Sequence, residues 1–165
     1  MATAQRTYLE MREPGALRPA ALDDPSIRIE QAVLCTPALY RFLYGEVGRQ
    51  YHWVDRLSWS DTDIRAHLDG GRVSIWIMSV QGTPAGYFEL SKDDDGAIEI
   101  AYFGLFEEFT GRRLGAHLLT RAVEQAWRMT TSRVWLHTCS LDHPAALPNY
   151  VGRGFTPYRT EEYSL

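Results

Sequence analysis

One segment, residues 99–119, constrains the fold of this chain more than any other. It begins as an alternating apolar run, passes through a short turn, and continues as a helix whose first residues include Gly111 and Gly115. Backbone N–H groups at a helix N-terminus have no helical partners, and the helix dipole adds positive potential there. A strand that leads into such a helix therefore predicts an anion-binding site.

The chain has 165 residues, of which 45% are apolar and 23% are charged, and these values predict one globular domain over residues 1–165. We expect an N-terminal strand or arm over residues 1–26 and a core over residues 27–158. No stretch approaches the roughly 20 apolar residues of a membrane helix, and the N-terminus does not resemble a secretory signal. These features predict a cytoplasmic protein with no membrane partner.

Charge and ligand spacing exclude further classes. The net charge of −4 and the absence of a basic patch disfavour a nucleic-acid partner. Cys35 and Cys139 lie far apart and form no Cys-x-x-Cys pair, and the histidines lack the spacing of a zinc site. We therefore expect two buried thiols and no metal.

The N-terminal part predicts two strands and two helices. The strands are expected at residues 7–11 and 27–34, either as a pair or as one strand plus an irregular arm. Thr36-Pro37 is typical of a helix start, and Ser60 with Asp63 is typical of a capping box that opens a second, short helix. The first helix is expected to bury one face formed by Leu39, Phe42, Leu43 and Val47.

The rest of the chain alternates between sheet and helix. A period of two predicts three antiparallel strands joined by tight turns, at residues 73–80, 86–91 and 97–105. A wide apolar stripe then predicts a helix through about residue 129. A strand, a short helix and a last strand follow, at residues 134–139, 143–153 and from 154 toward 158. The fold class is α/β with a mixed sheet, in which a strand–helix–strand crossover follows an antiparallel meander.

This order resembles the GNAT superfamily of acyl-CoA-dependent N-acetyltransferases, over roughly residues 27–158. The turn from Thr110 to Ala116 is similar to the family's cofactor signature, although Thr110 stands where Gln or Arg is usual and Arg113 replaces the first glycine. The second motif, from Tyr150 to Phe155, resembles the family's terminal tyrosine, three residues, then Gly-Phe. The resemblance implies a sheet with splayed central strands.

The resemblance also implies where acetyl-CoA binds as the co-substrate. Backbone around residues 103–105 would pair with the pantetheine arm, and the amides of residues 111–116 would hold the pyrophosphate. Arg113 is expected to have a helical backbone and to add a charge-assisted contact to a phosphate. The implied cofactor-binding residues are Phe103, Gly104, Leu105, Gly111, Arg112, Arg113, Leu114, Gly115 and Ala116.

Acetyl transfer from a thioester to an amine needs a base, an oxyanion donor and a proton for the leaving thiolate. The resemblance places the base at Glu99, and a partly buried carboxylate has a raised pKa that suits this role. Alternation puts Glu99 on one strand face with Ala101, Phe103 and Leu105. Glu89 is a second candidate that points toward the same cleft, and Glu99 as a cross-strand partner on a solvated face is the structural alternative.

The resemblance places the oxyanion donor at the backbone N–H of Phe103, beside a bulge that Gly104 would accommodate. Tyr150 matches the family's tyrosine near the cofactor sulfur, where a neutral phenol can donate a proton; a core tyrosine at a helix end is the alternative. Asp142 is expected to cap the helix that starts at His143-Pro144.

Four side chains are candidates for substrate binding: Tyr51, Trp53, Glu89 and His137. Tyr51, Trp53 and Trp59 belong to an aromatic segment at residues 48–60 that either lines an acceptor pocket or packs in the core. His137 is either a proton relay or a hydrogen-bonded structural histidine.

Together these features predict an acetyl-CoA-dependent N-acetyltransferase that acts on a primary amine of a small molecule or peptide. Transfer would be direct, in a ternary complex, in a monomer or homodimer. The alternative is a catalytically silent acyl-CoA-binding regulatory module. A dinucleotide-binding fold is disfavoured because its glycine turn would come near the N-terminus.

Overall fold

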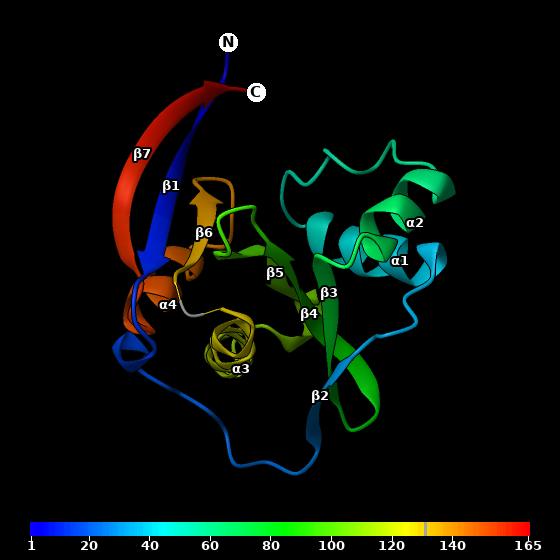
Figure 1. The fold of residues 1–165 in the computed structure, drawn as a ribbon, viewed down its shortest axis with the longest axis horizontal. Helices are drawn as coiled ribbons and strands as arrows, with labels where there is room; N and C mark the ends of the chain where they lie inside the picture. Colours follow the sequence, from blue (N-terminus) through cyan, green and yellow to red (C-terminus); the bar gives the residue numbers. More distant parts are fainter. Residues whose placement is uncertain (131) are drawn as a thin grey trace.

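A computed structural model describes residues 1–130 and 132–165. Its described residues form one mixed sheet of seven strands in the order β2-β3-β4-β5-β6-β1-β7, together with four α-helices (Figure 1). The strands are β1 (Thr3–Met11), β2 (Ile27–Gln31), β3 (Val73–Val80), β4 (Thr83–Lys92), β5 (Ile98–Leu105), β6 (Val134–Cys139) and β7 (Thr156–Ser164). The helices are α1 (Pro37–Gly48), α2 (Asp61–Asp69), α3 (Leu114–Met129) and α4 (Ala146–Gly152), with short 3-10 turns at Pro14–Ala16 and Glu107–Phe109.

The local start signals of the first two helices are confirmed. The Thr36 hydroxyl accepts a hydrogen bond from the backbone N–H of Leu39 at 3.2 Å, and a proline follows at the first helical position. At α2, Ser60 and Asp63 exchange both bonds of a capping box, at 2.8 and 3.1 Å. Such caps satisfy the N–H groups that a helix start leaves free, so short-range sequence is enough to specify them.

The predicted buried face of α1 is wrong at one position. Phe42 is 47% exposed, whereas Tyr40, Leu43, Tyr44 and Val47 are buried. The buried positions follow the i, i+3, i+4, i+7 spacing from Tyr40, and that spacing turns residue 42 away from the sheet. The amphipathic tyrosines, rather than Phe42, therefore form the inner face of this helix.

The N-terminal strand does not pair with β2. Instead β1 lies between β6 and β7 and is antiparallel to both, so the two chain ends run side by side (Figure 1). The Leu165 N–H even donates to the Ala2 carbonyl at 3.0 Å. This position buries Leu9 and Met11 and gives β1 a partner on each edge. The long-range pairing also extends β7 to Ser164, past the predicted end near Tyr158.

A bulge in β5 changes which side chains face the cleft. Leu90 pairs with Ile100 but Glu89 pairs with Tyr102, so Ala101 is an extra residue in the ladder. One extra residue reverses the alternation of every residue beyond it. Phe103 and Leu105 accordingly pack with the α3 side of the sheet, so the expectation that they share a face with Glu99 is wrong.

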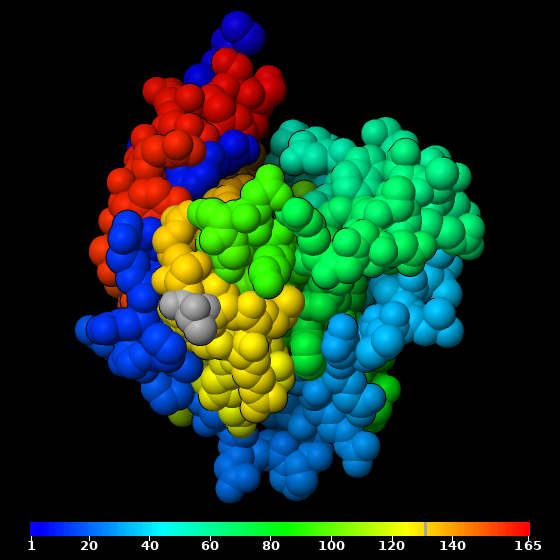
Figure 2. Space-filling model, in the orientation of Figure 1, coloured from blue at the N-terminus to red at the C-terminus, as the bar shows by residue number. Residues whose placement is uncertain are grey.

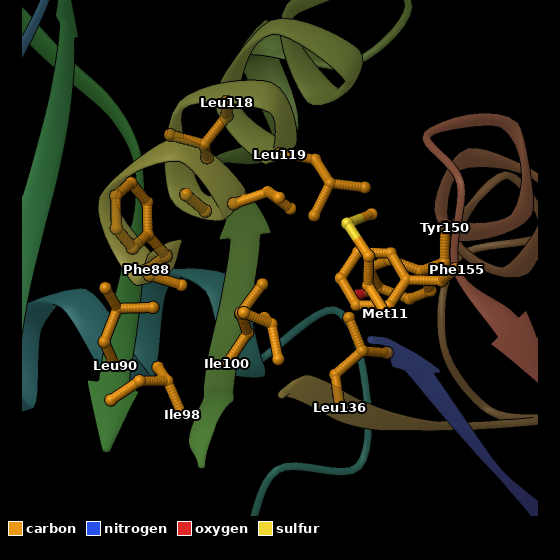
Figure 3. Packing of buried hydrophobic residues seen from close by; sticks show 14 of the residues in the cluster. Met11, Phe88, Leu90, Ile98, Ile100, Leu118, Leu119, Leu136, Tyr150 and Phe155 are labelled. Atoms are coloured by element: carbon orange, nitrogen blue, oxygen red, sulfur yellow. The ribbon is translucent and has the colours of Figure 1, made fainter. Parts of the chain in front are cut away.

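Two apolar clusters cover the two faces of the sheet. The larger one packs α3 and α4 against the central strands and includes the side chains drawn in Figure 3. The smaller one packs α1 and α2 against the opposite face of β3, β4 and β5. Parallel pairing of β5 with β6 is limited to Ile98↔Val134 and Glu99↔Trp135. Beyond these pairs the two strands separate, as the splayed-strand prediction requires.

Candidate active site

The separation of β5 from β6 opens a cavity of about 780 Å³. Its walls come from the segment before α2, from β5, from the turn that starts α3, from β6 and β1, and from α4. In Figure 2 a notch at the top separates the dark blue and red strands β1 and β7 from the green-cyan region of α2 and its preceding segment. The cavity therefore lies between the two halves of the sheet, where residues distant in sequence meet.

Glu99 is a carboxylate in this cavity with little compensation. Its side chain is 20% exposed, and its one ionic neighbour among the described residues is His137, with Nε2 3.9 Å from Oε1. Burial raises the pKa of Glu99 to about 7, and the negative charges of Asp93 and Glu89 add to the effect. A carboxylate with this pKa is half ionised near neutral pH and is free to exchange a proton.

Glu89, one strand away, has the opposite environment. Its side chain is fully buried and accepts hydrogen bonds from Tyr40 Oη at 2.8 Å and Arg56 Nη1 at 2.8 and 2.9 Å. His67 Nε2 lies 3.1 Å from its second oxygen. Burial alone would raise the pKa of Glu89, but the hydrogen bonds from His67 and Arg56 and the charge of Arg56 lower it. Glu89 does not line the cavity, and its bonding is already satisfied.

Arg56 is a residue that sequence reasoning missed. Its guanidinium lies between two aromatic rings, 4.7 Å from the Trp59 centroid and 4.5 Å from the Tyr102 centroid. Together with its bonds to Glu89, this stacking fastens the segment before α2 to the sheet. The available signal was a lone arginine within an aromatic segment, but nothing local showed which carboxylate it would meet.

Tyr51 and Trp53 line the cavity and also pack. The Trp53 ring lies edge-on to Tyr102 at 4.8 Å and beside Tyr51 at 6.4 Å. Trp59 does not line the cavity and instead stacks on Tyr40. The aromatic segment thus supplies both a cavity wall and core contacts.

Tyr150 reaches the cavity from α4. It is 7% exposed and lies edge-on to Phe103 at 6.0 Å and to Phe155 at 6.3 Å. Its hydroxyl makes no hydrogen bond with any other described residue. Burial raises the pKa of Tyr150, so the phenol stays protonated across the neutral range.

The glycine of the second motif is required by close packing. A Cβ on Gly154 would lie 2.0 Å from the Ala16 carbonyl oxygen, and the backbone φ of 109° also favours glycine. Phe155 is buried in the core directly after it. The motif therefore fixes how α4 and Tyr150 sit on the sheet.

Gly104 has a different role from the predicted one. It remains paired with Tyr87, and the bulge lies three residues earlier, at Ala101. A Cβ at Gly104 would lie 2.3 Å from Val47 Cγ1, so the glycine permits α1 to approach β5. Phe103, Gly104 and Leu105 all line the cavity.

The turn into α3 corrects a second expectation. Arg113 is not helical: it is the N-cap of α3 with φ 62° and ψ 9°, the left-handed region. In that region the side chain of a non-glycine residue is strained, which explains why glycine would be the easier choice here. Gly111 precedes it with φ 79°. The two left-handed residues turn the chain sharply from the preceding 3-10 turn into the helix.

The same turn leaves three backbone N–H donors without an acceptor in the described chain. Within the described chain, the N–H groups of Leu114, Gly115 and Ala116 have no hydrogen-bond acceptor. Gly111, Arg113, Gly115 and Ala116 line the cavity. The predicted residues Arg112 and Leu114 do not: the Arg112 guanidinium lies 5.5 Å from the Phe109 ring centroid, and Leu114 is buried in the core. A helix start with free N–H groups suits an anionic ligand.

Asp142 does not cap α4. Its carboxylate accepts hydrogen bonds from Thr138 Oγ1 at 2.5 Å and from the Cys139 N–H at 2.9 Å, whereas α4 begins after Ala145 with no side-chain cap. The carboxylate thus closes the turn after β6, because those donors lie nearer than the helix start. His137 and Cys139 project from the same strand into the cavity.

No group of three or more His, Cys, Asp or Glu side chains in residues 1–130 and 132–165 is arranged to hold a metal ion. Over the same residues, no helix has the length and apolar character needed to cross a membrane.

Comparison with known proteins gives a family and a fold. The family model described as acetyltransferase (GNAT) family matches residues 39–155. A search of the curated proteins finds no match. Among solved structures, a GCN5-related N-acetyltransferase from Kribbella flavida is similar, with a TM-score of 0.68, 17% identity, and coverage of 94% of this chain and 55% of that one.

Two further structures agree. A GCN5-related N-acetyltransferase from Sphaerobacter thermophilus has a TM-score of 0.67 and 13% identity, over 97% of this chain and 50% of that one. The ribosomal-protein-S18-alanine N-acetyltransferase from Escherichia coli has a TM-score of 0.59 and 16% identity, over 79% of this chain and 77% of that one. The chain thus spans about half the length of the first two structures, and at these identities the likeness concerns the fold.

Proposed function

The chain belongs to the GNAT acetyltransferase family, and from this premise we propose that it transfers an acetyl group from acetyl-CoA to a primary amine. The acceptor would be a small molecule or a peptide. The observation that carries the proposal is Glu99: a cavity carboxylate with a pKa of about 7 and no strong ion pair. Such a group is suited to remove a proton from an amine at neutral pH.

Glu99 is proposed as the general base. It takes a proton from the acceptor amine, directly or through water, as the nitrogen bonds to the thioester carbonyl carbon. Glu89 is not suited to this role because Tyr40, Arg56 and His67 already use its oxygens. Of the two carboxylates that the sequence suggested, only Glu99 lies on the cavity wall.

Phe103 and Tyr150 are proposed to act on the thioester, at its carbonyl oxygen and at its leaving sulfur. The Phe103 N–H would stabilise the oxyanion that forms on the carbonyl, and the Tyr150 hydroxyl would give a proton to the thiolate as the C–S bond breaks. The contact of the Phe103 and Tyr150 rings at 6.0 Å supports a shared position for these two roles. Exchange with solvent then removes the proton from Glu99 and returns a proton to Tyr150.

Acetyl-CoA supplies the activated acetyl group, and the residues present fit its phosphates. The N–H groups of Leu114, Gly115 and Ala116 have no acceptor within the described chain, and Gly115 and Ala116 line the cavity at the start of α3. The Arg113 side chain adds positive charge at the same place. The residues proposed to hold the pyrophosphate are therefore those of the left-handed turn and the first helical turn.

Cys139 allows a test of direct transfer against a covalent acetyl-enzyme. Its side chain lies on the cavity wall, so a covalent acetyl-enzyme is a definite competitor to be tested. We expect Cys139→Ala to keep turnover, because the proposed nucleophile is the amine itself. A loss of turnover that accompanies normal folding and normal acetyl-CoA binding would contradict direct transfer.

The main test is release of free CoA thiol from acetyl-CoA with a panel of primary amines. Glu99→Gln and Tyr150→Phe should abolish or greatly reduce turnover while acetyl-CoA still raises the melting temperature. Glu108→Gln and Tyr158→Phe are matched controls, since both residues are exposed and lie outside the cavity. If both site variants turn over normally, the catalytic assignment is wrong. Acetyl-CoA binding without turnover for any amine would instead indicate the regulatory module.

A further inference from the structure

The two terminal strands contribute a positive charge to the cavity wall. Arg6 on β1 and Tyr163 on β7 both line the cavity, beside Cys139 and His137 of β6. Arg6 pairs with Cys139 on one side and with Glu161 on the other. This wall exists only because β1 lies between β6 and β7, and the proposed reaction assigns it no role.

The Arg6 guanidinium is weakly satisfied by the protein. Its one carboxylate neighbour among the described residues is Glu161, with Nη1 3.5 Å from Oε1. Glu161 is itself held more firmly by the Tyr8 hydroxyl, at 2.7 Å, and also lies 3.7 Å from Arg159. Arg6 Nε is buried and has no hydrogen-bond partner in the described chain. Tyr8 and Tyr163 are further polar neighbours of the guanidinium. Its side chain is 31% exposed, so some of its five N–H donors remain available to a ligand.

Tyr163 holds this guanidinium in place. The Arg6 Cζ lies 4.6 Å from the Tyr163 ring centroid, which is within the range of a cation–π contact. A stacked guanidinium keeps its edges open for a planar acceptor such as a carboxylate. The Tyr163 ring therefore covers one face of the Arg6 guanidinium, and N–H donors on its edges remain available to a ligand.

Arg6 and Glu99 lie on either side of His137. Glu99 is 3.9 Å from His137, and His137 is directly opposite Tyr8 in the β6–β1 ladder. Arg6 is two residues from Tyr8 on the same strand face, which places its Cα about 8 Å from that of His137. After burial, the charge of Arg6 is the next largest cause of the lowered pKa of His137. One small molecule can therefore reach both Glu99 and Arg6.

We propose that the acceptor of this enzyme carries a carboxylate as well as its amine, and that Arg6 binds the carboxylate while Glu99 receives the amine. The inference rests on the proposed acetyl transfer and narrows its substrate class to amino acids or short peptides with the two groups a few bonds apart. Glu161 keeps its bond to Tyr8 when the ligand takes the Arg6 donors. Arg6 is thus a specificity-determining residue rather than a participant in the chemistry.

The test compares amines in matched pairs, each amino acid or dipeptide against its C-terminal amide. Wild type should use the acid with a kcat/KM about 10- to 100-fold higher, the range of a hydrogen bond to a charged group. Arg6→Gln should remove that preference by raising the KM of the acid alone. Arg6→Lys should keep part of it. Arg159→Gln is the control, because Arg159 also neighbours Glu161 but lies outside the cavity.

Equal use of acid and amide by wild type would overturn the inference. So would an Arg6→Gln variant that loses both substrates equally, since that indicates a structural role. A binding measurement needs no turnover: NMR titration of wild type and Arg6→Gln with N-acetylglycine and N-acetylglycinamide, in the presence of CoA. Acid-selective binding that depends on Arg6, without turnover, would refute the proposed reaction and support the carboxylate site. Equal binding of the two probes would refute the site.

Discussion

A fully buried and a partly buried carboxylate on neighbouring strands have opposite surroundings. Glu89 on β4 is fully buried and is bonded to Tyr40, Arg56 and His67. Among the described residues, Glu99 on β5 has one ionic neighbour, His137, at 3.9 Å. The pKa of Glu89 is lowered despite burial. The pKa of Glu99 is raised to about 7 by burial and by the charges of Asp93 and Glu89, which the charge of Arg56 offsets only in part.

The difference shows that burial alone does not make a base. A buried carboxylate whose bonding is complete is held ionised and stabilises the fold, and its proton affinity falls. A buried carboxylate with empty lone pairs beside a cavity holds a proton more tightly and can exchange it. The β5 bulge contributes to this arrangement, because it puts Tyr102 on the same sheet face as Glu99 and puts Phe103 on the α3 face.

The largest expected effect is on catalysis. Glu99→Gln should lower kcat by about 10²- to 10⁴-fold, the usual contribution of a general base, because glutamine cannot accept the amine proton. Acetyl-CoA binding should change little, as measured by thermal shift. If Glu89→Gln lowers kcat more than Glu99→Gln in protein that remains folded, the two roles are reversed.

Glu89 should instead control stability. Glu89→Gln leaves the Arg56 charge buried without its counter-ion, and breaking such a pair costs about 3–5 kcal/mol of unfolding free energy. Urea denaturation measures the change. The exposed control Glu108→Gln should stay within about 0.5 kcal/mol of wild type. A Glu89 variant as stable as that control would show that the cluster does not stabilise the fold.

The pH dependence of turnover distinguishes the two groups again. With saturating substrates, kcat should rise with pH and level off above an apparent pKa near 7, because only ionised Glu99 accepts a proton. Below that value the rate should fall about tenfold per pH unit. The residual activity of Glu99→Gln should lack this step, and a step that survives in the variant would belong to another group.

The smallest effect concerns the stability cost of Glu99. Its folded pKa of about 7 exceeds the ordinary value of 4.5, so the folded state binds a proton more readily than the unfolded state between these values. The contribution of Glu99 to the free energy of unfolding is therefore at its maximum below about pH 4.5, and it falls as the pH rises through 7. Glu99→Gln should stabilise the protein at pH 8 by about 1–3 kcal/mol relative to its effect at pH 4.5. No difference between the two pH values would mean that Glu99 is well solvated.

Much of the fold follows from local pattern. The alternation of apolar residues predicted β3 and the later strands, and the capping residues Thr36 and Ser60 marked the helix starts. The family resemblance indicates Glu99 and Tyr150, and both line the cavity. Arg56, Arg6 and Tyr163 were missed, because their importance depends on partners 33 or more residues away.

Three features that the sequence did not reveal share one cause. The bulge at Ala101, the left-handed backbone of Arg113 and the position of β1 are each decided by contacts beyond the local segment. A period of two cannot reveal where one extra residue enters a ladder. A non-glycine residue adopts a strained φ only when the surrounding structure requires it.

The sequence by itself determined the kinds of element, their order, and the two motifs that indicate the family, because propensity, capping and periodicity act within a few residues. The tertiary structure decided which carboxylate stays uncompensated, and it inserted the first strand beside the last so that Arg6 and Tyr163 reach the cavity. Those outcomes depend on the pairing of distant strands and on which charges meet inside the folded core, where the cost of burial is offset only by specific partners.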